Sequence, residues 1–179
     1  MGMGTHEMRS FSDLTKPNPP EYLLALDPGG TTGIAAFRNG GLVTYTQIKD
    51  FTPGTLDNFL TRQHRALGTA AANMEVVCED YRVYQTHTAQ HANSSLLTVR
   101  LLGALESWTE RHHTPLHLQM AGQAKPFSTD RKLQEWGMYI AGQPHATDAI
   151  RHGVYYLIFR RPQPPNPKQH TSTPTHRVG

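Results

Sequence analysis

Apolar positions in the first quarter of the chain form short runs that predict β-strands. Residues 22–27 (YLLALD) and 33–38 (GIAAFR) are two such runs. A third run, residues 42–48 (LVTYTQI), follows the turn signal NGG at 39–41. Three consecutive strands joined by short loops predict an antiparallel meander.

The apolar spacing then changes to the helical period. A helix is predicted to begin at Thr52 and Pro53, because the next apolar residues fall on one helix face: Leu56, Phe59, Leu60 and Leu67. Residues 75–80 (EVVCED) predict a short buried strand. Since this strand is entered through a helix, we expect it to run parallel to its neighbour in the sheet.

The rest of the chain continues this alternation. It predicts a helix from about Ser94 to His112, a strand over 115–120, a short helix capped by Ser128 that runs through Trp136, and a last helix that starts near Pro144 or His145 and ends before Pro162. The element order is therefore strand-strand-strand-helix-strand-helix-strand-helix-helix, which is typical of an α/β domain.

Length and composition favour a single domain between two tails. With 179 residues the chain suits one compact domain, which we place at residues 21–160. Residues 1–20 are polar, and residues 161–179 combine prolines with basic residues, so we expect both to be disordered.

Charge and cysteine content limit the function classes. The net charge of +3 and the pI of about 9.1 permit an anionic partner such as nucleic acid without requiring one. Cys78 is the only cysteine, which excludes a disulfide framework and a cysteine zinc site and is consistent with a cytoplasmic protein. No stretch is apolar enough to span a membrane.

Four polar residues occupy positions that the predicted fold would bring together. Asp27 and Glu79 lie at the ends of two strands that are predicted to be parallel neighbours, where an open α/β sheet usually has its site. His145 and Asp148 lie one turn apart at the start of the last helix. Taken singly, these residues could be a turn aspartate, a solvated glutamate and a helix cap. As a group they offer the hard oxygen ligands that suit Mg²⁺ or Mn²⁺.

The glycines beside Asp27 allow a second interpretation. The stretch ALDPGGTTG, residues 25–33, is similar to the phosphate loop of sugar kinases and actin-like ATPases. Those proteins need a second domain to close over the nucleotide, and we expect this chain to lack room for one. A P-loop motif is absent from the sequence. We therefore expect the glycines to clear space beside Asp27 for a metal ion and a DNA backbone.

Three segments taken in order resemble the RuvC-type Holliday junction resolvases of the RNase H-like superfamily, including small phage-encoded members. The segments are LALDPGGTTGIA from residue 24, VVCED from residue 76 and HATDAIRHGVYYL from residue 145. The resemblance implies an α/β RNase H-like fold, with a five-stranded mixed sheet of three antiparallel and then two parallel strands flanked by helices. It implies catalytic and metal-binding roles for Asp27, Glu79, His145 and Asp148.

The same resemblance implies a metal-dependent, structure-selective endodeoxyribonuclease. Such an enzyme would use two Mg²⁺ or Mn²⁺ ions per site to resolve four-way or other branched DNA by paired nicks, leaving 5′-phosphate and 3′-OH ends. In the family's pattern Asp27 bridges the two ions, Glu79 binds the one that faces the leaving oxygen, and Asp148 binds the one that carries the attacking water. His145 is either a ligand or the group that takes the proton of that water.

The resemblance also bears on the DNA contacts and on alternative functions. We expect DNA contacts from Tyr81, Arg82, Tyr84 and Lys125, and we expect His152 to be an ordinary helix histidine. A nuclease acting on RNA, flaps or forks stays open, whereas a non-catalytic branched-DNA-binding module is disfavoured because none of the acids is missing.

A homodimer is expected through the helix of residues 94–112. Its apolar positions are more widely distributed than one core-facing stripe needs, and Leu101 and Leu105 are candidate contact positions. Complete burial of this helix within the monomer is the alternative.

Overall fold

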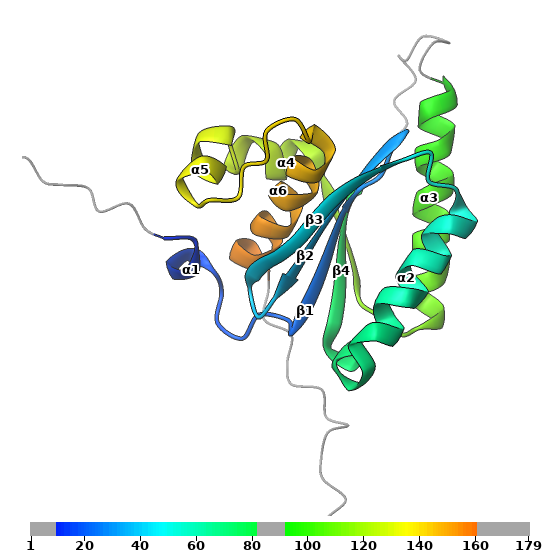
Figure 1. Ribbon diagram of the computed structural model, residues 1–179, viewed down its shortest axis with the longest axis horizontal. Helices are drawn as coiled ribbons and strands as arrows, with labels where there is room; N and C mark the ends of the chain where they lie inside the picture. The colour runs from blue at the N-terminus through cyan, green and yellow to red at the C-terminus, as the bar shows by residue number, and fades with distance from the viewer. Residues whose placement is uncertain (1–9, 82–91, 161–179) are drawn as a thin grey trace, which may run out of the picture.

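The computed structural model describes residues 10–81 and 92–160, which form a five-stranded sheet with helices on both faces (Figure 1). The strands are β1 (Tyr22–Asp27), β2 (Thr31–Arg38), β3 (Gly41–Lys49), β4 (Met74–Asp80) and β5 (Leu116–Met120). Their order is β3-β2-β1-β4-β5. The pairs β3–β2 and β2–β1 are antiparallel, and the pairs β1–β4 and β4–β5 are parallel. The predicted mixed sheet is confirmed.

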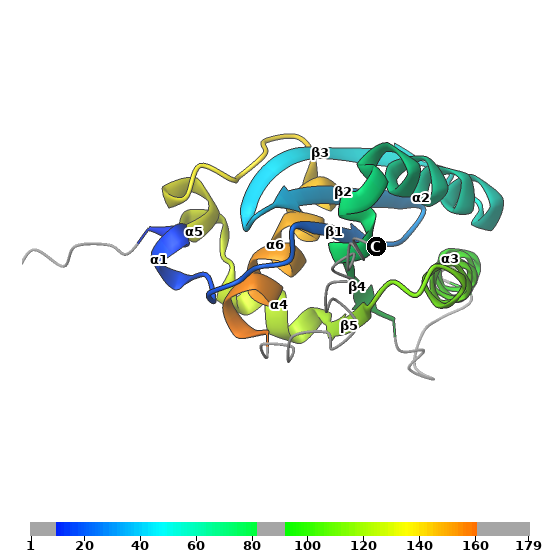
Figure 2. The same cartoon turned by 90° about the horizontal axis from the view of Figure 1, so that it is seen from below.

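The helices form a layer on each side of the sheet. They are α1 (Phe11–Leu14), α2 (Pro53–Leu67), α3 (Ala92–Arg111), α4 (Ala121–Phe127), α5 (Asp130–Glu135) and α6 (Pro144–Phe159). Helices α2 and α3 cover one face, and α6 lies across the other, with α1, α4 and α5 on the same side (Figure 2). A 3₁₀ turn, Gly68–Asn73, joins α2 to β4.

Strand β1 is buried along its whole length because both faces of the sheet are covered. Its side chains alternate between two apolar clusters: Leu24 and Leu26 pack toward α2 and α3, while Leu23 and Ala25 pack toward α6. Asp27 therefore points toward α6, since it continues the series of Leu23 and Ala25.

Helix α6 is fixed to the sheet by close packing and by a polar cluster. A Cβ atom at Gly153 would lie 2.2 Å from the ring of Phe37 on β2, so only glycine allows this approach. Near the end of the helix, Tyr156 donates a hydrogen bond to Glu75 on β4, and its hydroxyl lies 2.9 Å from Nε2 of His117 on β5. These contacts set the position of the helix that carries two of the predicted site residues.

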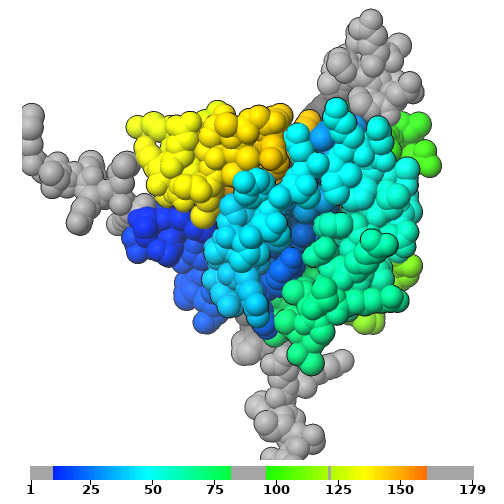
Figure 3. Space-filling view, in the orientation of Figure 1, coloured from blue at the N-terminus to red at the C-terminus, as the bar shows by residue number. Residues whose placement is uncertain are grey.

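The N-terminal prediction is wrong for residues 10–20, which contain the short helix α1. Ser10 and Asp13 form a capping box, and Phe11 is buried against Trp136. In the space-filling view α1 (blue) lies against the segment that contains α5 (yellow) and beside the hairpin of β2 and β3 (cyan) (Figure 3). The buried ring of Phe11, together with hydrogen bonds from Lys16 and Arg160 that tie this segment to the end of α6, orders a stretch whose polar composition favours disorder.

The capping prediction at Ser128 is also wrong. Ser128 ends the unpredicted helix α4, and Thr129 caps α5 by accepting a hydrogen bond from the amide of Lys132. Gly122 and Pro126, both poor helix formers, lie within the seven residues of α4 and hide the helix from sequence patterns.

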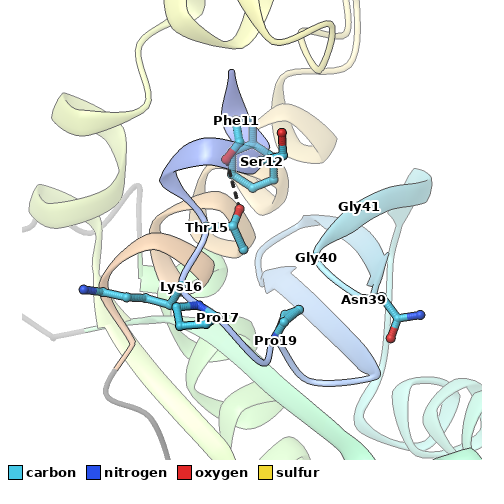
Figure 4. A pocket seen from close by; sticks show the side chains of 9 residues that line it. All are labelled: Phe11, Ser12, Thr15, Lys16, Pro17, Pro19, Asn39, Gly40 and Gly41. Atoms are coloured by element: carbon cyan, nitrogen blue, oxygen red, sulfur yellow. Dashed lines mark hydrogen bonds between the residues drawn. The ribbon is translucent and has the colours of Figure 1, made fainter. Parts of the chain in front are cut away.

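A cavity of about 450 Å³ lies between α1 and the turn that joins β2 to β3 (Figure 4). This turn is at the end of β2 that is remote from Asp27, because Asp27 pairs with Gly33 near the start of β2. The cavity wall includes Pro17, Pro19 and Lys16 but no carboxylate side chain, so it is separate from the predicted site. Among the described residues, no helix is long and apolar enough to cross a membrane.

Candidate active site

Strand register places four residues side by side across one end of the sheet, on the face that α6 covers. They are Gly33, Asp27, Glu79 and Gln119. Asp27 pairs with Gly33 across β1 and β2, and Glu79 pairs with Gln119 across β4 and β5. The register of β1 and β4 pairs Leu26 with Cys78, so Asp27 and Glu79 follow side by side at the next position. The two segments that carry Asp27 and Glu79 therefore converge through strand pairing.

Gly33 lets the first turn of α6 approach this row. A Cβ atom at Gly33 would lie only 1.8 Å from the carbonyl oxygen of His145, whereas one at Gly30 would have no neighbour within 4 Å. The space that Gly33 leaves is filled by the helix backbone, so the expectation that this glycine clears room for a metal ion and DNA is wrong. The absence of a side chain at Gly33 lets His145 lie against Asp27.

Asp27 lies in a concentration of negative charge. Its side chain is 11% exposed, and Nδ1 of His145 lies 3.2 Å from its Oδ2. Burial, together with the charges of Glu79 and Asp148, raises the pKa of Asp27 to about 8. Asp27 is therefore a carboxyl group whose ionised form is costly until positive charge arrives nearby.

Lys125 of α4 supplies positive charge between two of the acids. Its Nζ lies 3.1 Å from Oδ2 of Asp148 and 3.5 Å from Oε2 of Glu79. Partial burial alone would lower the pKa of Lys125, but the hydrogen bond to Asp148 and the negative charge of Glu79 raise it. The predicted DNA contact at Lys125 thus lies within the acid cluster itself.

Arg151, one turn along α6, holds the other oxygen of Asp148. Its Nη1 pairs with Oδ1 of Asp148, its Nη2 pairs with Asp130 of α5, and its Nε donates to the carbonyl oxygen of Ser128 at 2.9 Å. Asp148 is consequently held between two cationic side chains of its own chain, Lys125 and Arg151.

His152 is a member of the site, and its assignment as an ordinary helix histidine is wrong. The ring is fully buried, with Nε2 3.0 Å from Oε2 of Glu79 and Nδ1 3.0 Å from Oε1 of Gln119. Burial alone would raise the pKa of Glu79, but the hydrogen bond with His152 and the charge of Lys125 lower it. The spacing from Asp148 to His152, one helical turn, is the sequence signal that pointed to this placement.

The structure thus brings together Asp27, Glu79, His145 and Asp148, and it adds Lys125, Arg151, His152 and Gln119. Within the described residues, no three His, Cys, Asp or Glu side chains are arranged so that they could hold a metal ion. The donor chemistry still fits a hard divalent cation, because the site gathers three carboxyl groups, and burial together with the charges of Glu79 and Asp148 raises the pKa of Asp27.

The remaining predicted DNA contacts lie after β4. Tyr81 is partly buried against the cluster between the sheet, α2 and α3. Arg82 and Tyr84 lie outside the described residues. Asp80 pairs with Met120 and, by strand alternation, faces away from the acid cluster.

No protein-family model and no curated protein matches the sequence. Among solved structures, Thermus thermophilus RuvC in complex with a Holliday junction substrate aligns with a TM-score of 0.56 at 14% identity, over 77% of this chain and 93% of RuvC. A second T. thermophilus RuvC structure aligns with a TM-score of 0.52 at 16% identity, over 77% of this chain and 94% of RuvC. At these identities the likeness concerns the fold: this chain has the RNase H-like fold of RuvC.

Proposed function

We propose that this chain is a structure-selective endodeoxyribonuclease that resolves four-way or other branched DNA by paired nicks. The observation that carries the proposal is the convergence of Asp27, Glu79 and Asp148, from two strand ends and one helix, with the ammonium group of Lys125 between Glu79 and Asp148. The shared fold supports the proposal, because the structure of T. thermophilus RuvC that this chain resembles is a complex with a Holliday junction substrate.

The acid cluster would hold divalent cations, Mg²⁺ or Mn²⁺, two per site, with Asp27, Glu79 and Asp148 as ligands and His145 as a further ligand or proton acceptor. The raised pKa of Asp27 supports this assignment, since bound positive charge would relieve the repulsion from Glu79 and Asp148. When bound, such cations make a water molecule nucleophilic and stabilise the leaving 3′ oxygen, which yields 5′-phosphate and 3′-OH ends.

The chain's own residues hold the reacting groups. His145 is anchored to Asp27 through Nδ1 and, when neutral, can take up the proton of the attacking water. Lys125 is 41% exposed and carries the positive charge that a phosphodiester needs as it enters. Arg151 keeps Asp148 in place from the opposite side, so Lys125 can move toward DNA without releasing that acid.

A symmetric dimer would supply the two nicks, because each chain has one acid cluster. The surface that we assign to the dimer contact consists of exposed apolar side chains on α3 and on the side of β5 that faces the α3 layer. They are Leu96, Val99, Leu118 and Met120. Leu101 and Leu105 are 1% exposed, so the expectation that they are contact positions is wrong. They belong to the core of the monomer.

The test is cleavage of matched substrates in MgCl₂ or MnCl₂: a four-way junction, a fork, a flap, a linear duplex and an RNA duplex of the same sequence. We expect symmetric paired nicks in the four-way junction, little cleavage of the linear duplex and no cleavage in EDTA. The Glu79→Gln variant is the control, because it removes one charge and keeps the shape. A preference for forks, flaps or RNA would keep the nuclease and change its substrate, and binding without cleavage of any substrate would refute the proposal.

A further inference from the structure

His152 is a buried polar side chain that the cleavage chemistry above does not use. Its exposed fraction is 0%, and each ring nitrogen lies 3.0 Å from a side-chain oxygen, one on β4 and one on β5. Buried polar groups in proteins are nearly always hydrogen-bonded, but a histidine with both nitrogens engaged across two strands is a specific arrangement. It connects α6 to the strand end that carries Glu79.

The proton positions follow from the partners. An ionised Glu79 can only accept hydrogen bonds, so Nε2 of His152 must carry a proton. The contact between Nδ1 and Gln119 adapts to this requirement, because the side-chain amide of Gln119 can present either its oxygen or its nitrogen. In both orientations an N–H group points at Oε2 of Glu79.

We propose that His152 is a positioning residue that fixes the carboxylate of Glu79 for cation binding, and that Gln119 fixes the ring of His152. The proposal rests on the proposed nuclease function. Lys125 also contacts Oε2 of Glu79 but is partly exposed, so it is free to exchange this contact for a phosphate. His152 is a buried donor that stays when Lys125 leaves. Groups that orient a metal ligand in this way commonly affect metal affinity by about 10–100-fold.

Two substitutions of similar polarity separate positioning from mere burial. His152→Gln places an amide nitrogen near the position of Nε2 and keeps the donor to Glu79. His152→Asn is shorter and reaches only as far as Nδ1. Calorimetric titration with MnCl₂, without DNA, is the readout, and circular dichroism with thermal unfolding shows whether each variant is folded.

We expect His152→Asn to weaken Mn²⁺ binding by about tenfold or more, and His152→Gln to stay within about threefold of the wild type. Cleavage of the four-way junction by His152→Asn should then recover in part at high Mn²⁺ concentration. Equal Mn²⁺ affinity in all three folded proteins, or an equal loss in both variants, would overturn the proposal.

A measurement without metal separates this proposal from the nuclease proposal. In ¹⁵N-labelled protein in EDTA, the ring spectrum of His152 should show a protonated Nε2 whose resonance moves in the Glu79→Gln variant. An unprotonated Nε2, or a resonance that does not respond to this substitution, would overturn the role of His152 even in an active nuclease. If the protonated Nε2 is found but the wild type neither binds Mn²⁺ nor cleaves DNA, the nuclease proposal fails, and with it the role in cation binding.

Discussion

Replacing Asp27 by Asn should stabilise the metal-free protein at alkaline pH while abolishing cleavage. The two side chains have nearly the same shape, so the substitution removes mainly the charge. In the wild type, burial and the charges of Glu79 and Asp148 raise the pKa of Asp27 from 3.8 to about 8. Since the folded state holds this proton more tightly than the unfolded state, the resulting stability is fully present below about pH 4 and is lost as the pH rises to about 8.

The size of the effect has an upper limit. One pH unit of pKa difference corresponds to about 1.4 kcal/mol, so the shift of Asp27 would cost at most about 6 kcal/mol once the group is ionised. Rearrangement of Lys125 and entry of water reduce this cost, because both bring compensating charge or polarity to Asp27. We expect Asp27→Asn to exceed the wild type by about 2–3 kcal/mol in free energy of unfolding at about pH 8.5, and by less than about 1 kcal/mol at about pH 4.5.

Urea denaturation in EDTA, followed by circular dichroism at both pH values, measures this difference. Glu110→Gln, an exposed carboxylate on α3, is the matched control and should show no such dependence on pH. Adding MgCl₂ at the higher pH should restabilise the wild type more than Asp27→Asn, because a cation that binds the folded state shifts the equilibrium toward it. The reasoning fails if Asp27→Asn is the less stable protein at about pH 8.5, or if both proteins respond equally to pH.

Three further outcomes follow from the structure. Glu79→Gln should lower cleavage by at least about a thousandfold while junction binding, measured by gel shift, stays equal or becomes tighter; a parallel loss of binding would point to misfolding. Gly33→Ala should destabilise the fold by about 1–3 kcal/mol in urea denaturation and reduce cleavage, because its Cβ meets the backbone of His145, whereas Gly30→Ala has open space and should do neither. Leu96→Glu should shift equilibrium sedimentation from dimer to monomer with the fold intact, while Leu105→Glu should unfold the protein; a dimer that survives Leu96→Glu would exclude this surface as the contact.

Strand patterns carry most of the information about the fold. The apolar runs and the turn at 39–41 predict the meander, and the prediction of a parallel β4 next to β1, which the strand register confirms, places Asp27 and Glu79 at the same end of the sheet. The proximity of Asp27, Glu79, His145 and Asp148 could be predicted, because it depends mainly on which strands are neighbours and on where α6 begins. Their chemical role is a proposal.

The positions of the other residues in the cluster depend on structural details that the sequence pattern does not predict. Lys125 reaches the acids because α4 follows β5 directly, and Gly122 and Pro126 conceal that helix. Gln119 joins His152 because of the register of β5, and a shift of one residue would turn it to the opposite face. A helix position alone does not say which strand residue lies beneath it.

The close packing of α6 has a consequence for changes in chain length. The helix is fixed at its first turn by Gly33, further along by Gly153 against Phe37, and near its end by Tyr156 on Glu75. Inserting one residue between 144 and 153 would rotate everything that follows by about 100° relative to what precedes it, so His145 and Gly153 could not both keep their places. In the loop before the helix, Met138 is buried in the core, whereas Ala141 and Gly142 are exposed. Insertions and deletions among homologous chains should therefore accumulate at these two exposed positions and be absent from the helix.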